Sequence, residues 1–115
     1  MSKFYDALET RSSAEREAAH MAALPQQVAH AQKASSAFAS ILAGVDASAV
    51  TSRAALAQLP VTRKYELLER QVASRTRSGP DWDPFGGFSA VGWRAMAGAG
   101  KLRSARRVYQ SPGTP

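Results

Sequence analysis

The sequence predicts a mainly α-helical protein, with a short N-terminal unit of four or five helices followed by a loop-rich arm. As far as residue 72, apolar side chains recur at spacings of three and four, which is the period of a helix with one buried face. Beyond residue 72, Gly, Pro, Ser and Asp occur at the density of loops, and large apolar side chains become sparse. We therefore expect a helical region over residues 1–74 and an arm over residues 75–115.

The first long helix is expected to begin after Ser12. Ser12 and Glu15 have the spacing of a capping box, in which each side chain accepts a backbone N–H of the other residue. Apolar residues at helical spacing follow as far as about Lys33. Pro25 lies inside this pattern, and it either kinks the helix or opens a second helix at its first turn.

Short helices are expected next. The apolar cluster at 38–42 has helical spacing, and Gly44 is the predicted C-cap. Asp46 is expected to cap a single turn, and another short helix begins at Thr51-Ser52 and ends at Pro60.

Thr62 is the predicted N-cap of the last helix in this region. The helix is expected to span about ten residues and to carry the apolar side chains Tyr65, Leu67, Leu68 and Val72.

The arm carries isolated aromatic residues and one candidate strand. Trp82, Phe85 and Phe88 stand in a loop-like stretch, where aromatic side chains either pin the loop onto a neighbouring surface or bind a ligand. Residues 91–101 show no clear period. Residues 107–110 form the only plausible strand, and because one strand is not stable alone, it requires a sheet from elsewhere.

Most of the net charge of +6 lies on the arm, which holds seven basic and two acidic residues. Such a segment favours an anionic partner, so one function that the sequence permits is a small basic module for nucleic acid or for protein interaction. The basic residues of the arm are Arg75, Arg77, Arg94, Lys101, Arg103, Arg106 and Arg107.

Composition excludes several classes of chemistry. The absence of cysteine rules out disulfides, thiolate nucleophiles and cysteine-based zinc sites. No apolar run approaches the ~20 residues needed to span a bilayer, and the N-terminus lacks the apolar segment of a signal peptide. We therefore expect a cytoplasmic protein with no membrane association.

Two sequence features suggest a phosphate-binding loop and a metal site, but neither has the required spacing. The AGAGK stretch at 97–101 resembles the end of a phosphate-binding P-loop, but that pattern needs Gly at 95 and Ser or Thr at 102, where the chain has Ala95 and Leu102. His20 and His30 are ten residues apart, whereas a helical metal pair is separated by four. We therefore assign no catalytic residue and no metal site.

One stretch resembles a known enzyme family. The segment LPVTRKYELLERQ, residues 59–71, is similar to a Leu-Pro-x-Thr-x-Lys-x-(Asp/Glu)-Leu element in the N-terminal region of the phenylacetate–CoA ligase group of adenylate-forming enzymes. Further family elements follow the same order. The matching residues are Leu24, Val28, Ala31, Ser36, Phe38, Leu42, Gly44, Val45 and Asp46 before that segment, Leu59, Pro60, Thr62, Lys64, Glu66 and Leu67 in it, and Pro84, Phe85 and Gly86 after it.

The resemblance implies a phosphate-binding turn at the end of the chain. In the family, a strand leads at this place into a Ser-Ser-Gly-Thr-Thr-Gly loop, and Ser111, Gly113 and Thr114 match that loop. Pro112 and Pro115 replace a Ser and a Thr, which removes backbone donors and hydroxyls. The turn is therefore either a degenerate nucleotide site or a turn that has lost nucleotide binding.

The resemblance also implies a function for a longer protein. The chain would be an N-terminal fragment of a larger α/β enzyme that activates a carboxylic acid, aryl by analogy, with ATP through an acyl-adenylate. ATP, magnesium and coenzyme A would serve the full-length ligase, and the 115 residues alone are expected to be inactive. The partner would be the rest of that enzyme or an equivalent sheet.

Overall fold

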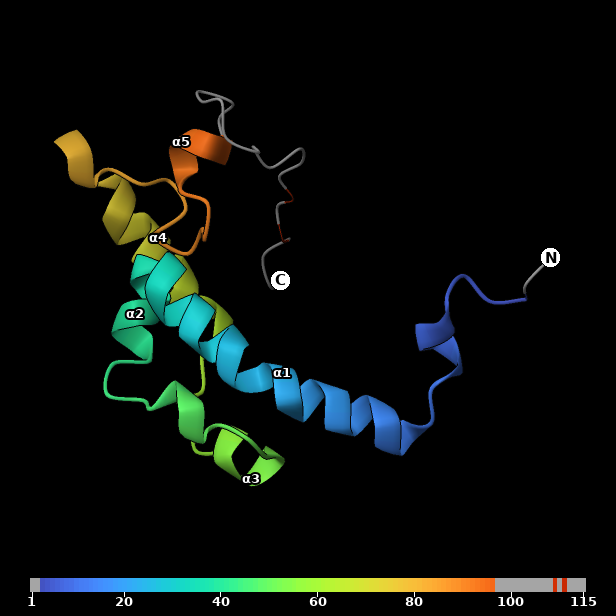
Figure 1. Cartoon of the computed structure of the whole chain (residues 1–115). Coiled ribbons are helices and arrows are strands. Elements are labelled where there is room, and N and C mark those ends of the chain that lie inside the picture. Colours follow the sequence, from blue (N-terminus) through green and yellow to red (C-terminus); the bar gives the residue numbers. More distant parts are fainter. Residues whose placement is uncertain (1–2, 97–108, 110, 112–115) are drawn as a thin grey trace. The chain divides into compact units, whose positions relative to one another are not determined.

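The structure is a computed structural model that describes residues 3–96, 109 and 111 (Figure 1). In this part of the chain it contains five α-helices, three short 3-10 helices and no strand. The prediction of a mainly α-helical chain is therefore confirmed. The strand expected at 107–110 lies outside the described residues, apart from Tyr109, whose side chain is exposed.

The chain divides into two units, which we describe separately. The first unit contains the residues up to His30 together with Gly44–Leu59. The second unit contains Ala31–Ala43 together with the residues from Pro60 onward.

The first unit is built from short helices and most of one long helix. In chain order these are a 3-10 helix at Ala7–Thr10, α1 at Ser13–Ala34, a 3-10 helix at Ala47–Ala49 and α3 at Arg53–Leu56. Helix α1 continues through Pro25, so this proline does not open a second helix.

Side chains two or three residues away cap these helices. The Ser12 N–H donates to Glu15 Oε2 at 2.8 Å, and the Glu15 N–H donates to Ser12 Oγ at 3.2 Å, which confirms the predicted capping box. Asp46 Oδ1 accepts the Ser48 N–H at 3.0 Å, and Ser52 Oγ accepts the Ala55 N–H at 3.1 Å. The predicted cap at Asp46 is therefore also confirmed, and the helix expected to start at Thr51-Ser52 has Ser52 as its N-cap.

Few residues of the first unit are buried. Val28 on α1 and Val50 after the second 3-10 helix expose 6% and 3% of their surface. An exposed ion pair also joins two distant parts of the first unit. In it, the Arg53 guanidinium donates to both carboxylate oxygens of Glu17. This bond, followed by the positive charge of Arg53, lowers the pKa of Glu17 below its usual value.

The second unit contains α2 at Ser36–Ile41, α4 at Lys64–Arg75, a 3-10 helix at Gly79–Asp81 and α5 at Trp93–Met96. Helix α2 ends at Leu42 as its C-cap, so the prediction of Gly44 as the C-cap was wrong. Gly44 instead ends the following turn with a φ of 79°, a conformation that glycine adopts without a Cβ penalty.

Helix α4 begins one residue later than the sequence suggests. Arg63 has the extended backbone of an N-cap, and its N–H donates to Glu66 Oε2 at 3.0 Å. The prediction of Thr62 as the cap was therefore wrong, because the Glu66 carboxylate closes the first turn against Arg63.

Helix α5 is a single turn that the sequence pattern did not reveal. Its four residues are too few to show a helical period. In the described part of the chain, no helix is both long enough and apolar enough to cross a membrane.

Candidate functional site

The residues predicted for the phosphate turn are only partly described. Ser111 is exposed, whereas Gly113 and Thr114 lie outside the described residues. The phosphate turn therefore stays a prediction. His20 and His30 are exposed on α1, and the described residues contain no group of three or more His, Cys, Asp or Glu side chains that could hold a metal ion.

The best-defined polar structure in the second unit is the segment Asp83–Phe88, which we call the docking loop. Asp83 organises it from one end. Its carboxylate accepts the Phe85 N–H at 2.8 Å through Oδ1 and the Gly87 N–H at 3.1 Å through Oδ2. The Asp83 carbonyl also accepts the Gly86 N–H at 3.1 Å. Both oxygens of the carboxylate are therefore used inside the loop.

The far end of the docking loop meets the N-terminus of α2. The Gly87 carbonyl accepts the Ala37 N–H at 3.0 Å, the Ser35 hydroxyl at 2.9 Å and the Ser36 hydroxyl at 3.3 Å. Ser35 is 2% exposed and also accepts the Phe38 N–H at 3.3 Å. Ser35 therefore caps α2 and holds the loop, which joins segments about 50 residues apart.

Two glycines allow this close approach. Gly86 and Gly87 have φ values of 67° and 79°, where residues with a Cβ are strained. A Cβ on Gly87 would lie 2.3 Å from Ser36 Oγ, and a Cβ on Gly86 would lie 3.0 Å from backbone atoms of Gln71 on α4. The sequence Gly86-Gly87 thus lets one loop pack against both α2 and α4.

Aromatic side chains complete the loop contacts. The Phe88 ring meets the Phe38 ring of α2 edge to face, with centroids 5.6 Å apart. Trp82, just before the loop, meets Trp93 of α5 in the same way at 4.9 Å. The expectation that arm aromatics pin the loop to a neighbouring surface is confirmed for Phe88 and Trp82.

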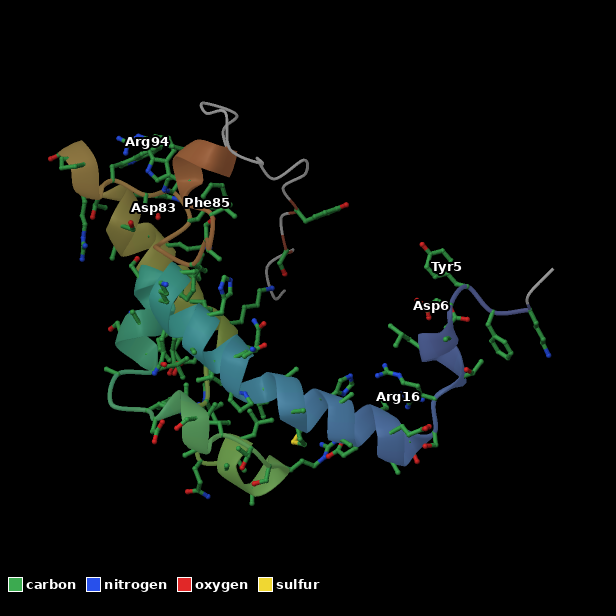
Figure 2. The ribbon with its side chains drawn as sticks, viewed as in Figure 1. Tyr5, Asp6, Arg16, Asp83, Phe85 and Arg94 are labelled. Carbon is green, nitrogen blue, oxygen red and sulfur yellow. The ribbon has the colours of Figure 1, made fainter. Side chains whose placement is uncertain are left out.

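A cleft of about 650 Å³ lies beside the docking loop, and we call it the arginine cleft. Helices α2, α4 and α5 and the segment between α4 and α5 line it. Its charged and aromatic wall residues are Arg70, Arg77, Arg94, Asp83, Trp82 and Trp93. Figure 2 labels Asp83, Phe85 and Arg94 in this part of the second unit.

The electrostatic balance of the arginine cleft is positive. Among the side chains that the structure describes, none of the three cleft guanidinium groups pairs with a carboxylate. Asp83 contributes the described negative charge of the wall, and its oxygens are hydrogen-bonded to the backbone of the docking loop. The guanidinium of Arg94 lies over the Trp93 ring, 4.9 Å from its centroid.

A second hollow of about 670 Å³ lies along α4. Its wall includes Pro60, Thr62, Glu66 and Leu67 from the family-like segment, together with Ile41 of α2. Arg70 of α4 lines both hollows.

The sequence pointed to some residues of the arginine cleft but did not predict that they line one cleft. Arg77 and Arg94 belonged to the basic arm, and Trp82 was a candidate anchor or binding residue. Arg70 and Trp93 were missed. No sequence signal joins Arg70 to Arg77, because α4 ends at Arg75 and Arg77 lies in the segment beyond it.

Comparisons of this chain with protein-family models, with curated proteins and with solved structures returned no match.

Proposed function

We propose that this chain is the N-terminal helical part of an adenylate-forming enzyme similar to phenylacetate–CoA ligases. The whole enzyme would act in the cytoplasm on a carboxylic acid, with ATP as the activating substrate and coenzyme A as the acyl acceptor. In this proposal the 115 residues provide structural support and the approach to the nucleotide loop, while the reacting groups lie in the rest of the enzyme.

Contacts of the family-like motifs with one another and with the residues directly beside them support this proposal. The Ser36-x-Phe38 step, the segment at 59–71 and the Pro84-Phe85-Gly86 step are far apart in sequence. In the second unit, Ser36 and Ala37 donate to Gly87, and Phe38 meets Phe88. Gly86 packs against Gln71 at the end of the 59–71 segment. Motifs that meet in one small structure are expected to form one functional element rather than chance matches.

The chemistry of the enzyme places a limit on what this chain does. Magnesium and ATP phosphates need carboxylates and a donor-rich loop, and the described residues hold no candidate metal cluster. Ser111, Gly113 and Thr114 remain the proposed contribution to the phosphate loop. We therefore expect the chain alone to form no adenylate.

Pyrophosphate release tests the proposal. The purified 115-residue chain, incubated with ATP, magnesium and a panel of aryl acids, should release no pyrophosphate above the buffer rate. The reading frame that follows codon 115 should encode an acidic ribose-binding residue and a distal lysine, and the product of the extended frame should release pyrophosphate with at least one of these acids. Activity of the short chain alone, or an inactive extended product without those residues, would contradict the proposal.

A further inference from the structure

We propose that the arginine cleft is a binding site for a small aromatic phosphate monoester. Arg77 and Arg94 would hold the phosphate, and the tryptophan pair would contact the ring. This inference does not depend on the proposed ligase function, because it rests on the residues of the cleft alone.

The arginine cleft carries positive charge that no described ion pair balances. Arg70, Arg77 and Arg94 line one cleft, and no described carboxylate pairs with any of them. Asp83 is the acidic residue of the described wall, and its two oxygens already accept backbone N–H groups. Like charges that share a cleft repel one another, so an anion that enters between them relieves this repulsion.

Arg77 and Arg94 carry more of this argument than Arg70. Arg70 also lines the neighbouring hollow, where Glu66 and Glu69 contribute negative charge. Glu66 is engaged with the Arg63 N–H, yet it still lowers the local potential near Arg70. Of the two hollows described, Arg77 and Arg94 line the arginine cleft and not its neighbour.

Arg94 contacts an aromatic ring at the wall of the cleft. Its guanidinium lies over the ring of Trp93 at 4.9 Å from the centroid. The face of an indole ring attracts a cation, so this contact favours a position of the Arg94 charge beside Trp93 at the cleft wall. The edge of a guanidinium matches two oxygens of a phosphate, so Arg94 has the donors for bidentate binding at this place.

Charge and size together select the ligand class. A phosphate monoester carries close to two negative charges at neutral pH, whereas a carboxylate carries one. Arg77 and Arg94, beside one aspartate whose oxygens are already hydrogen-bonded, therefore favour the phosphate. A cleft of about 650 Å³ falls within the range of small-molecule sites, about 300–1,000 Å³, and leaves room for a ring beside the phosphate.

The two tryptophans supply both the ring contact and the signal for a test. Trp82 and Trp93 are the two tryptophans of the chain, and both line the cleft. Each is half-buried. Their indole N–H resonances and their fluorescence therefore report on this cleft without interference from other tryptophans.

Titration with phenyl phosphate tests the site in the full 115-residue chain. We expect both indole resonances to shift in a saturable way and tryptophan fluorescence to change with the same midpoint. Inorganic phosphate should bind at least several-fold more weakly because it lacks the ring, and phenol should cause no saturable shift because it lacks the charge. An equal affinity for inorganic phosphate, or an equal response to phenol, would overturn the proposal.

The matched variants are Arg77→Gln, Arg94→Gln and Arg16→Gln. Each removes one positive charge from an exposed side chain, and Arg16 lies on α1 in the first unit (Figure 2). We expect each cleft variant to weaken phenyl phosphate binding about tenfold through loss of a charge-assisted hydrogen bond. The variant Arg16→Gln should leave binding within twofold. Circular dichroism spectra equal to that of the wild type establish that each variant is folded.

Two results would contradict the site. Equal weakening by Arg16→Gln and by the cleft variants would show that net charge alone attracts the ligand. A single-stranded oligonucleotide that displaces phenyl phosphate at lower concentration, with an affinity that falls steeply with salt, would assign the cleft to nucleic acid instead.

Discussion

The two units of the chain are held together in different ways. In the first unit, most of the described side-chain hydrogen bonds join residues two to five positions apart, as at Asp6, Ser12, Asp46 and Ser52. The exposed pair of Glu17 and Arg53 is its described long-range polar link. In the second unit, Gly87 accepts hydrogen bonds from residues 51 and 52 positions away, and one of these donors, Ser35, is 2% exposed.

This difference indicates which contacts should contribute most to the free energy of unfolding. A hydrogen bond between exposed neighbours competes with water and contributes little, whereas a buried cap that also fixes a distant loop stabilises tertiary structure. We therefore expect substitutions around Gly87 to unfold the second unit, and substitutions at the Glu17–Arg53 pair to have small effects. The following predictions run from the largest expected effect to the smallest.

Gly87→Ala should have the largest effect. The new Cβ would lie 2.3 Å from Ser36 Oγ in a backbone with a φ of 79°. The strained backbone alone costs on the order of 1–3 kcal/mol, and the close contact adds to that cost. Urea unfolding followed by tryptophan fluorescence measures the loss, because both tryptophans belong to the second unit.

Gly92→Ala is the matched control for this substitution. Gly92 has a φ of 75°, but nothing lies within 4 Å of its missing Cβ. Gly92→Ala should therefore lower the free energy of unfolding only by the cost of the strained backbone. The double variant Ser36→Ala, Gly87→Ala should recover part of the difference, and equal losses for the two glycine variants would argue against close packing at Gly87.

Asp83→Ala should destabilise the docking loop by about 1–3 kcal/mol, since two backbone N–H groups lose a charged acceptor. Asp83→Asn retains one oxygen acceptor, so its loss should lie between those of the wild type and the alanine variant. The same urea titration measures both variants. An asparagine variant as unstable as the alanine variant would mean that the charge, rather than the two separate bonds, determines the loop.

Ser35→Ala should cost about 1 kcal/mol through loss of the α2 cap and of one donor to Gly87. Ser36→Ala is the comparison, because the Ser36 hydroxyl lies farther from Gly87, at 3.3 Å, and does not cap the helix. Thermal unfolding of the two variants should rank Ser35→Ala as clearly less stable. The reverse order would contradict the prediction that Ser35 contributes more to stability than Ser36.

Glu17→Gln should have the smallest effect, and this effect should depend on pH. Hydrogen bonding to Arg53 lowers the pKa of Glu17 in the folded protein. The pair therefore contributes its stability above the ordinary glutamate pKa of 4.5 and loses it as the pH falls through the lowered pKa of the folded state. Wild type and variant should differ slightly at pH 7 and converge in strong acid, as measured by thermal melts in circular dichroism.

Glu69→Gln is the control for that experiment, because it removes an exposed carboxylate from the second unit, where no described ion pair holds it. High salt should also reduce the difference between wild type and Glu17→Gln, because exposed pairs are screened. A difference that persists at low pH would show that the pair is not its cause.

The contrast between the units also explains what the sequence could predict. Ser12 and Asp46 were identified as caps, and Thr51-Ser52 as the start of a helix, because capping depends on residues two or three positions away. Thr62 was predicted as a cap because its side-chain chemistry is suitable. The prediction failed because Glu66 accepts the Arg63 N–H, which makes Arg63 the N-cap of the helix. Helix α5 is too short to leave a periodic signal.

The arginine cleft could not be derived in the same way. Its walls meet only because the docking loop returns to α2, which depends on Gly86, Gly87 and a buried serine acting together. The aromatics of the arm gave a correct hint that the loop is anchored. Neither their partners nor the convergence of Arg70, Arg77 and Arg94 is encoded in any short stretch of sequence.

Amide hydrogen exchange at Ala37 tests the central claim most directly. The Ala37 N–H donates to the Gly87 carbonyl, so its protection reports whether the docking loop holds the N-terminus of α2. We predict that Ala37 is protected in the wild type and exchanges much faster in Asp83→Ala, while amides of α1 between residues 17 and 24 keep their rates. Unchanged protection of Ala37 in that variant, or an equal loss across α1, would contradict the account.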